Sequence, residues 1–95
     1  MQYRPFYFIY IVQCADGTYY TGKTWNLMQR IKQHNGELRG GARYTKLRRP
    51  VEIKYFETYK EHKLAARREY EIKKLSHTEK DQLCQKGYIP LEDFK

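Results

Sequence analysis

The chain has 95 residues, 40% of them hydrophobic and 32% charged, which is enough for one domain and too charged for a membrane protein. No apolar run approaches the roughly 20 residues of a membrane span, and the apolar N-terminus lacks the basic region and cleavage site of a secretion signal. The net charge of +8 is typical of a domain that binds a polyanion, and the ten tyrosines either stack on bases or fill the core.

The N-terminal part of the chain predicts a β-hairpin followed by a helix. Residues 6–14, FYFIYIVQC, are aromatic and β-branched as in a strand, and residues 19–24, YYTGKT, would form the return strand. Asn26 is a suitable N-cap for a helix that runs to about Asn35. The apolar stripe of this helix is expected to consist of Leu27 and Ile31.

The middle of the chain predicts a basic loop, a third strand and a longer helix. The loop would span residues 37–50, where Gly36, Gly40 and Gly41 break the helical pattern. Residues 51–59, VEIKYFETY, alternate as a strand does, and residues 60–75 read as a helix. Unless the loop is merely a solvated turn, its cations are candidates for phosphate contacts, namely Arg43, Lys46, Arg48 and Arg49.

The C-terminal part predicts a third helix over residues 77–86. Ser76 and Glu79 form a capping-box pattern at its start, and Gly87 suits the C′ position after its end. The order β-β-α-β-α-α predicts an α+β fold, a small three-stranded antiparallel sheet flanked by helices. The expected domain and tail have the boundaries 1–87 and 88–95.

The length of the hairpin loop decides which side chains share a face of the sheet. A two-residue loop would place Tyr10 and Tyr20 on opposite faces, because side chains alternate along a strand. We favour a three-residue loop, residues 15–17, with Gly17 in the left-handed conformation. Tyr10 then faces Gly22, and the two phenols flank a gap suited to a phosphate, unless they are an ordinary cross-strand pair in the core.

Two of the predicted helices, the one after the hairpin and the one after the third strand, carry polar residues on or beside their apolar stripes. Arg30 and His34 share a face of the first helix and are expected to emerge at the sheet edge, near the hairpin. There arginine can bind a phosphate and histidine can transfer a proton, unless both are a solvated flank. Glu69 lies on the small-residue stripe of the next helix, where it either pairs with Lys73 or holds a hard cation such as Mg²⁺.

Together these residues resemble the GIY-YIG nuclease family, and the resemblance extends from about Phe6 to Leu83. Its two motif elements correspond to Phe8-Ile9-Tyr10 and Tyr20-Thr21-Gly22, in which Phe8 and Thr21 depart from the usual residues. Arg30 corresponds to the arginine on the family's first helix, and His34 to a position on that helix that carries histidine or tyrosine. Lys23 corresponds to a lysine of the family's excision-repair branch, and Glu69 to its metal-binding glutamate.

The resemblance implies an endonuclease that hydrolyses phosphodiester bonds in DNA, as in DNA repair, with Mg²⁺ or alternatively Mn²⁺ held by Glu69. Tyr10 or Tyr20 would help to activate the attacking water, assisted by His34. Arg30 and Lys23 would stabilise the charge that develops on the phosphate. With no sequence-reading module in view, we expect selection by DNA structure, or a protein partner that supplies specificity.

Two other functions compete with the nuclease. The chain could be a non-catalytic nucleic-acid-binding module that keeps the fold, or a protein-interaction domain that docks through its basic helix. Cys14 and Cys84 stand in no metal-ligand spacing and are expected to be reduced. With no secretion signal, this predicts a location in the cytoplasm, or in the nucleus if the source is eukaryotic, and no membrane partner.

Overall fold

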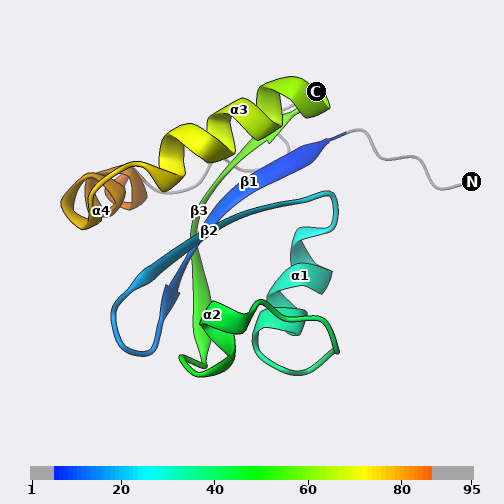
Figure 1. Cartoon of the computed structure of the whole chain (residues 1–95), viewed down its shortest axis with the longest axis vertical. Helices are drawn as coiled ribbons and strands as arrows, with labels where there is room; N and C mark the ends of the chain where they lie inside the picture. Colours follow the sequence, from blue (N-terminus) through cyan, green and yellow to red (C-terminus); the bar gives the residue numbers. More distant parts are fainter. Residues whose placement is uncertain (1–5, 87–95) are drawn as a thin grey trace, which may run out of the picture.

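A three-stranded antiparallel sheet forms the centre of the molecule (Figure 1), which is a computed structural model describing residues 6–86. β1 (Tyr7–Cys14) lies in the middle, between β2 (Tyr19–Thr24) and β3 (Val51–Tyr59). Since β1 pairs antiparallel with both neighbours, the α+β fold class and its three-stranded antiparallel sheet are confirmed.

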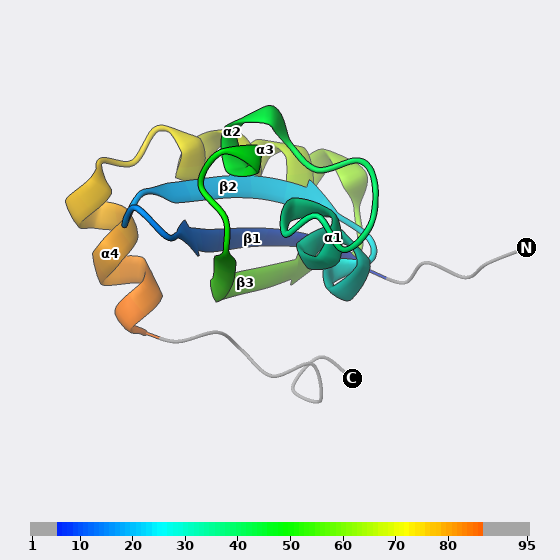
Figure 2. The same cartoon turned by 90° about the horizontal axis from the view of Figure 1, so that it is seen from below.

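Helices cover both faces of the sheet. Figures 1 and 2 show α1 (Leu27–His34) and α2 (Arg43–Lys46) on one face, and α3 (His62–Lys73) and α4 (His77–Gln85) on the other. The expected order of strands and longer helices is therefore present. The four-residue helix α2 is an addition, because it lies within the segment expected to be entirely loop.

Both faces of β1 are buried, which explains its continuous apolar sequence. Tyr10 and Val12 point toward α1, where Leu27 and Ile31 pack against the same cluster. Ile9 points the other way, into a cluster that α3 completes with Ala65 and Ile72. The alternation of the central strand thus separates the interior into two cores, and Tyr10 belongs to the core beneath α1.

The predicted helix caps are present. The side chain of Asn26 accepts a hydrogen bond from the Gln29 amide at 3.1 Å. The Glu79 amide donates to the Ser76 hydroxyl at 3.1 Å, and the Ser76 amide donates to the Glu79 carboxylate at 2.9 Å, which completes the capping box. Gly87 and the tail 88–95 lie outside the described residues.

The two cysteines agree with the expectation that they form no disulfide. Cys14 and Cys84 are both free. Among the helices of residues 6–86, none has the length and apolar character that crossing a membrane requires.

The hairpin has the favoured three-residue loop. The Cys14 amide donates to the Thr18 carbonyl at 2.8 Å, and Gly17 takes a φ of 86°, the left-handed region that glycine adopts without strain. The register pairs Tyr10 with Gly22, and Val12 with Tyr20. Because side chains alternate, Tyr10 and Tyr20 lie on the same face of the sheet, toward α1.

Candidate active site

Tyr10 is the buried centre of the candidate site. Its side chain is 1% exposed, and its ring lies directly on the backbone of Gly22 in the edge strand β2. A Cβ at Gly22 would overlap the Tyr10 hydroxyl and would lie 2.5 Å from Cζ. The glycine therefore admits the phenol ring itself, and the space that we expected to remain beside the phenol is filled.

His34 does not emerge at the sheet edge, contrary to the expectation from its helix face. It is 0% exposed and lies between β1 and α2 in the core. Its Nε2 is 2.7 Å from the Tyr10 hydroxyl, and its Nδ1 is 2.8 Å from the hydroxyl of Thr45. The reason is that α2 covers this end of α1 and brings Thr45 as a buried partner, which satisfies a histidine that would otherwise need water.

Thr45 determines which nitrogen of His34 carries the proton. The Thr45 hydroxyl donates to the Ala42 carbonyl at 3.0 Å, so it accepts from His34 Nδ1–H. Nε2 is then unprotonated and accepts from the Tyr10 hydroxyl. No motif or spacing in the sequence indicates this role of Thr45, because residues 37–50 have the pattern of a basic loop.

The environment of His34 also predicts how stability depends on pH. Burial lowers the pKa of His34 to about 4, and the nearby Arg30 and Arg49 cations act in the same direction. In the unfolded chain an imidazole titrates near about 6.5, so below that pH the unfolded state binds a proton that the folded state does not. Stability should therefore fall as the pH drops from about 6.5 to about 4, by about 3 kcal/mol in all.

Denaturant unfolding between about pH 7 and pH 4 measures this loss. A His34→Asn variant, which has no imidazole at this position, is the control. Its free energy of unfolding should fall less steeply with decreasing pH than that of the wild-type protein. Equal slopes in the two proteins would show that other groups cause the acid sensitivity.

Tyr20 borders the candidate site on the side of α2. It is half-buried between two rings, with its centroid 5.1 Å from that of His34 in an edge contact and 5.9 Å from that of Tyr44 in a stacked one. Tyr44 is held in turn by the Arg48 guanidinium, 3.9 Å above its ring. Tyr44, like Thr45, was not predicted to take part, because the segment that carries both was expected to be a loop.

Three groups act electrostatically on the Tyr10 hydroxyl. Burial raises the pKa of Tyr10 to about 12; Arg30 opposes this rise, and Tyr20 and Glu69 add to it. Arg30 is positioned by hydrogen bonds from Nη1 to the Gln33 side chain at 3.0 Å and to the Gly40 carbonyl at 2.6 Å. The structure therefore brings the two tyrosines, Arg30, His34 and Glu69 into one neighbourhood.

Glu69 reaches this neighbourhood from the other face of the sheet. Its helix α3 packs by Ala65 and Ile72 and also contacts the edge strand β2. The Glu69 side chain is 20% exposed and pairs with the more exposed Lys73 at 3.3 Å. The ion pair considered from the sequence is thus present.

A second carboxylate, Glu57 on β3, has a different environment. It accepts two hydrogen bonds from Arg68, at 2.8 and 2.9 Å, and one each from the hydroxyls of Tyr55 and Tyr59. These four bonds occupy its oxygens and tie α3 to the sheet. Between the two carboxylates, Glu69 has the more open coordination sphere.

The predicted phosphate-contact residues fall into two groups. Arg43 and Lys46 are exposed on α2. Arg48 is bound to Asp16 at 3.1 Å, and Arg49 donates to the His34 carbonyl at 2.6 Å, so both also support the fold. Arg49 sits at the C-terminal end of α1, where a cation is favoured.

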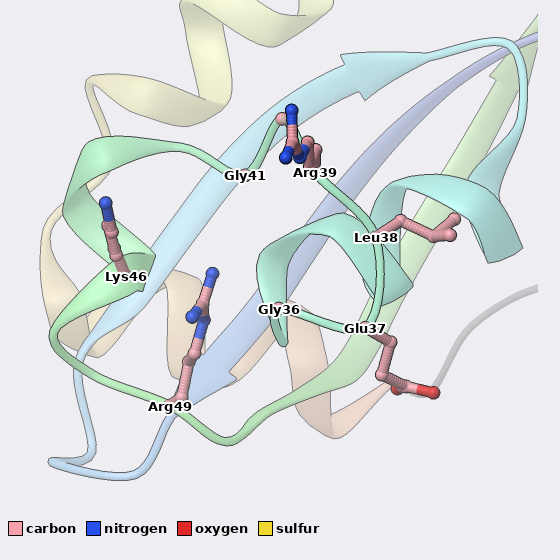
Figure 3. A pocket seen from close by; sticks show the side chains of 8 residues that line it. Gly36, Glu37, Leu38, Arg39, Gly41, Lys46 and Arg49 are labelled. Carbon is pink, nitrogen blue, oxygen red and sulfur yellow. The ribbon is translucent and has the colours of Figure 1, made fainter.

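The segment after α1 forms a basic cleft of about 370 Å³ (Figure 3). Lys46, Arg49 and Arg39 line it together with glycines, and the Glu37 carboxylate points away from the space that they enclose. Three cations around a glycine-rich backbone suit an anion such as a phosphate group. Arg39 had been placed in the loop but not among the candidate contacts.

Comparison with known proteins points to one family. The model of the GIY-YIG catalytic domain matches residues 6–82. The UPF0213 protein DP2720 of Desulfotalea psychrophila is 52% identical over 88 residues, which cover 90% of this chain and 79% of the relative. The UPF0213 protein SERP0126 of Staphylococcus epidermidis is 46% identical over 81 residues, covering 85% and 96%.

Solved structures share the fold. The solution structure of the UPF0213 protein BH0048 from Bacillus halodurans has 38% sequence identity and a TM-score of 0.54, covering 84% of this chain and 83% of that one. The solution structure of EF2693 from E. faecalis has 30% identity and a TM-score of 0.60, and covers 90% of each chain.

Proposed function

Because the chain belongs to the GIY-YIG family, we propose that it is a metal-dependent endonuclease that cleaves DNA and selects its substrate by structure rather than sequence. The observation that supports this best is the surroundings of the Tyr10 hydroxyl. It donates to a buried, neutral His34, and Arg30, Tyr20 and Glu69 all influence its pKa. A phenol with a proton acceptor behind it and a cation beside it is suited to proton transfer.

Tyr10 and His34 would act as a proton relay. The hydroxyl proton of Tyr10 points at His34 Nε2, so the remaining lone pairs of its oxygen can accept a proton from water. As the water oxygen bonds to phosphorus and the bond from phosphorus to the leaving oxygen breaks, the water proton would pass to Tyr10 and the phenolic proton to His34 Nε2, while the leaving oxygen takes a proton from solvent. The raised pKa of Tyr10 favours this concerted transfer over a free phenolate. Tyr20, which is half-buried, is the alternative acceptor.

Arg30 and Lys23 would stabilise the negative charge of the transition state. The guanidinium of Arg30 is held by two hydrogen bonds from a single nitrogen, Nη1. Its planar group can therefore bind phosphate oxygens without much reorganisation. Lys23 follows Gly22 directly in β2 and lines the same cleft as Arg30.

The donor set fits a single hard cation, Mg²⁺ or Mn²⁺, at Glu69. Within residues 6–86 no group of three or more His, Cys, Asp or Glu side chains could hold a metal, so a closed zinc site does not fit. Mg²⁺ accepts one carboxylate and completes its shell with water and phosphate oxygens. When bound, such an ion polarises the phosphate and stabilises the leaving oxygen.

A cleavage assay tests the proposal. The purified protein is incubated with duplex, nicked, flapped, branched and single-stranded DNA, and with the matching RNAs, in Mg²⁺, Mn²⁺ or chelator. We expect metal-dependent cleavage that is fastest on a branched or flapped DNA. Binding without cleavage in either metal would replace the nuclease with a non-catalytic nucleic-acid-binding module.

The exposed cations of α2 are expected to contribute affinity rather than chemistry. Replacing Arg43 and Lys46 together by glutamine should reduce the slope of log K against log salt concentration by about 1.8, because each lost phosphate contact removes about 0.9. Fluorescence anisotropy with a labelled duplex at several salt concentrations measures this slope.

The matched control for this pair replaces Lys54 and Lys86 by glutamine. It changes the net charge equally, but on β3 and at the end of α4. The control should leave the slope nearly unchanged. If the two pairs behave alike, α2 does not contact the phosphates, and the affinity reflects net charge alone.

A further inference from the structure

A separate cleft of about 360 Å³ opens beside Arg30, outside the basic cleft after α1. Its walls come from the ends of β1 and β2, from α1 and from the first residue of α3. The residues that matter for its chemistry are Tyr7, Lys23, Trp25, Arg30 and His62.

The cleft is positively charged. Lys23 and Arg30 both line it, and none of the described residues in its walls is acidic. Lys23 Nζ is 2.9 Å from His62 Nε2, which holds the ammonium group at the wall instead of letting it extend into solvent. A site with two positioned cations favours an anionic ligand.

The cleft also presents an aromatic surface. The Trp25 ring is 49% exposed, and its centroid lies 6.1 Å from that of Tyr7 at an angle of 55°. Tyr7 also makes an edge contact with His62, at 5.3 Å between ring centroids. A supported and half-exposed indole provides a surface on which a base can stack.

Phosphate-binding cations and an aromatic surface within one cleft match the two parts of a nucleotide. We propose that this cleft binds the unpaired nucleotide that carries the cleaved phosphodiester, with its base on Trp25 and that phosphate on Lys23 and Arg30. Arg30 lines this cleft and also acts on the Tyr10 hydroxyl, so the cleft and the candidate active site lie side by side. The proposal rests on the proposed function and specifies its substrate class.

The consequence is a preference for DNA with an unpaired nucleotide beside the cleavage point. In a continuous duplex each base is stacked and paired, and moving it into the cleft would cost a few kcal/mol. A flap or branch point supplies an unpaired base without that cost.

Trp25 is the chain's one tryptophan, so its fluorescence reports on the cleft directly. In chelator, where cleavage is prevented, a short thymidine oligomer should quench the Trp25 emission in parallel with binding measured by anisotropy. A blunt duplex should bind with little quenching. Oligomer binding without quenching, equal quenching by the duplex, or no oligomer binding at low salt would each overturn the proposal.

A set of variants separates stacking from general affinity. Trp25→Ala should weaken oligomer binding by about fivefold to a hundredfold, and Trp25→Phe should retain most of it. Tyr70→Ala is the control, because Tyr70 is 62% exposed on α3 and does not line the cleft. If Tyr70→Ala weakens binding as much as Trp25→Ala, the assignment of the base to Trp25 is wrong.

The proposed function is tested separately by cleavage in Mg²⁺. Wild-type protein that cleaves no DNA, yet shows the oligomer-specific quenching, would refute the nuclease and support the cleft as a nucleotide site. Wild-type protein that cleaves flaps, with a flap preference unchanged in Trp25→Ala, would support the nuclease and overturn this inference.

Discussion

Replacing Glu69 by alanine is expected to abolish metal-dependent cleavage, lowering the rate by at least about a thousandfold, while the chain folds and binds DNA as before. The carboxylate is the proposed ligand of the metal, and the stabilisation that a metal gives a phosphoryl transition state amounts to several kcal/mol. In the structure Glu69 is paired with Lys73, an exposed cation that can move aside when a metal binds.

The fold should survive this change because α3 is anchored elsewhere. Arg68 is bound to Glu57 by two short hydrogen bonds, and Ala65 and Ile72 fill the core beneath the helix. Losing the Glu69–Lys73 pair costs little, because the Lys73 side chain is 52% exposed and can turn into water. The loss of activity would therefore be chemical rather than structural.

Glu71→Ala is the matched control for Glu69→Ala. Glu71 lies two residues further along α3, carries the same charge and forms exposed ion pairs with Arg67 and Arg68. Single-turnover rates on a flapped DNA in Mg²⁺ compare the two variants. Cleavage by Glu69→Ala at the wild-type rate would remove the metal assignment, and equal losses in both variants would point to the charge of α3 as a whole.

The strands and the hairpin register could be predicted because local chemistry determines them. Gly17 in a three-residue loop fixes which residues pair, and the pairing places Tyr10 and Tyr20 on one face. Asn26 and Ser76 marked the starts of two helices for the same reason, since a cap acts within a few residues of its own position.

The burial of His34 could not be predicted in the same way. Its spacing from Leu27 and Ile31 does place it on the apolar side of α1, but a polar residue there is buried only if a partner satisfies it. That partner, Thr45, comes from α2, within a segment whose glycines and cations indicated a loop. The contact depends on how the segment folds back over α1, which no local pattern determines.

The network around Glu57 was missed for a related reason. Glu57 alternates with apolar residues along β3 and looks like an ordinary solvent-facing position. It is only 12% exposed because Arg68 covers it from α3, a contact between residues eleven positions apart in sequence. Tertiary packing rather than strand periodicity therefore distinguishes this structural carboxylate from Glu69.

Tyr10→Phe is expected to lower the cleavage rate by about a hundredfold to ten-thousandfold, the usual contribution of a group that transfers a proton. Phenylalanine keeps the ring that packs on Gly22 and removes the hydroxyl that donates to His34. The buried Nε2 of His34 then lacks its donor, which should also cost about 1–3 kcal/mol of stability.

Val51→Ala provides the control that separates these two effects. It removes methyl groups from the core cluster that also contains Tyr10 and so carries a similar cost in stability, but it leaves the Tyr10 hydroxyl, His34 and Thr45 in place. Thermal unfolding should shift comparably in both variants, whereas the single-turnover rate should fall much further in Tyr10→Phe. Tyr20→Phe, tested alongside, identifies the acceptor of the water proton. A large loss of rate in Tyr20→Phe, with near-normal cleavage by Tyr10→Phe, would transfer that role to Tyr20. The buried hydrogen bonds through His34 would then be purely structural.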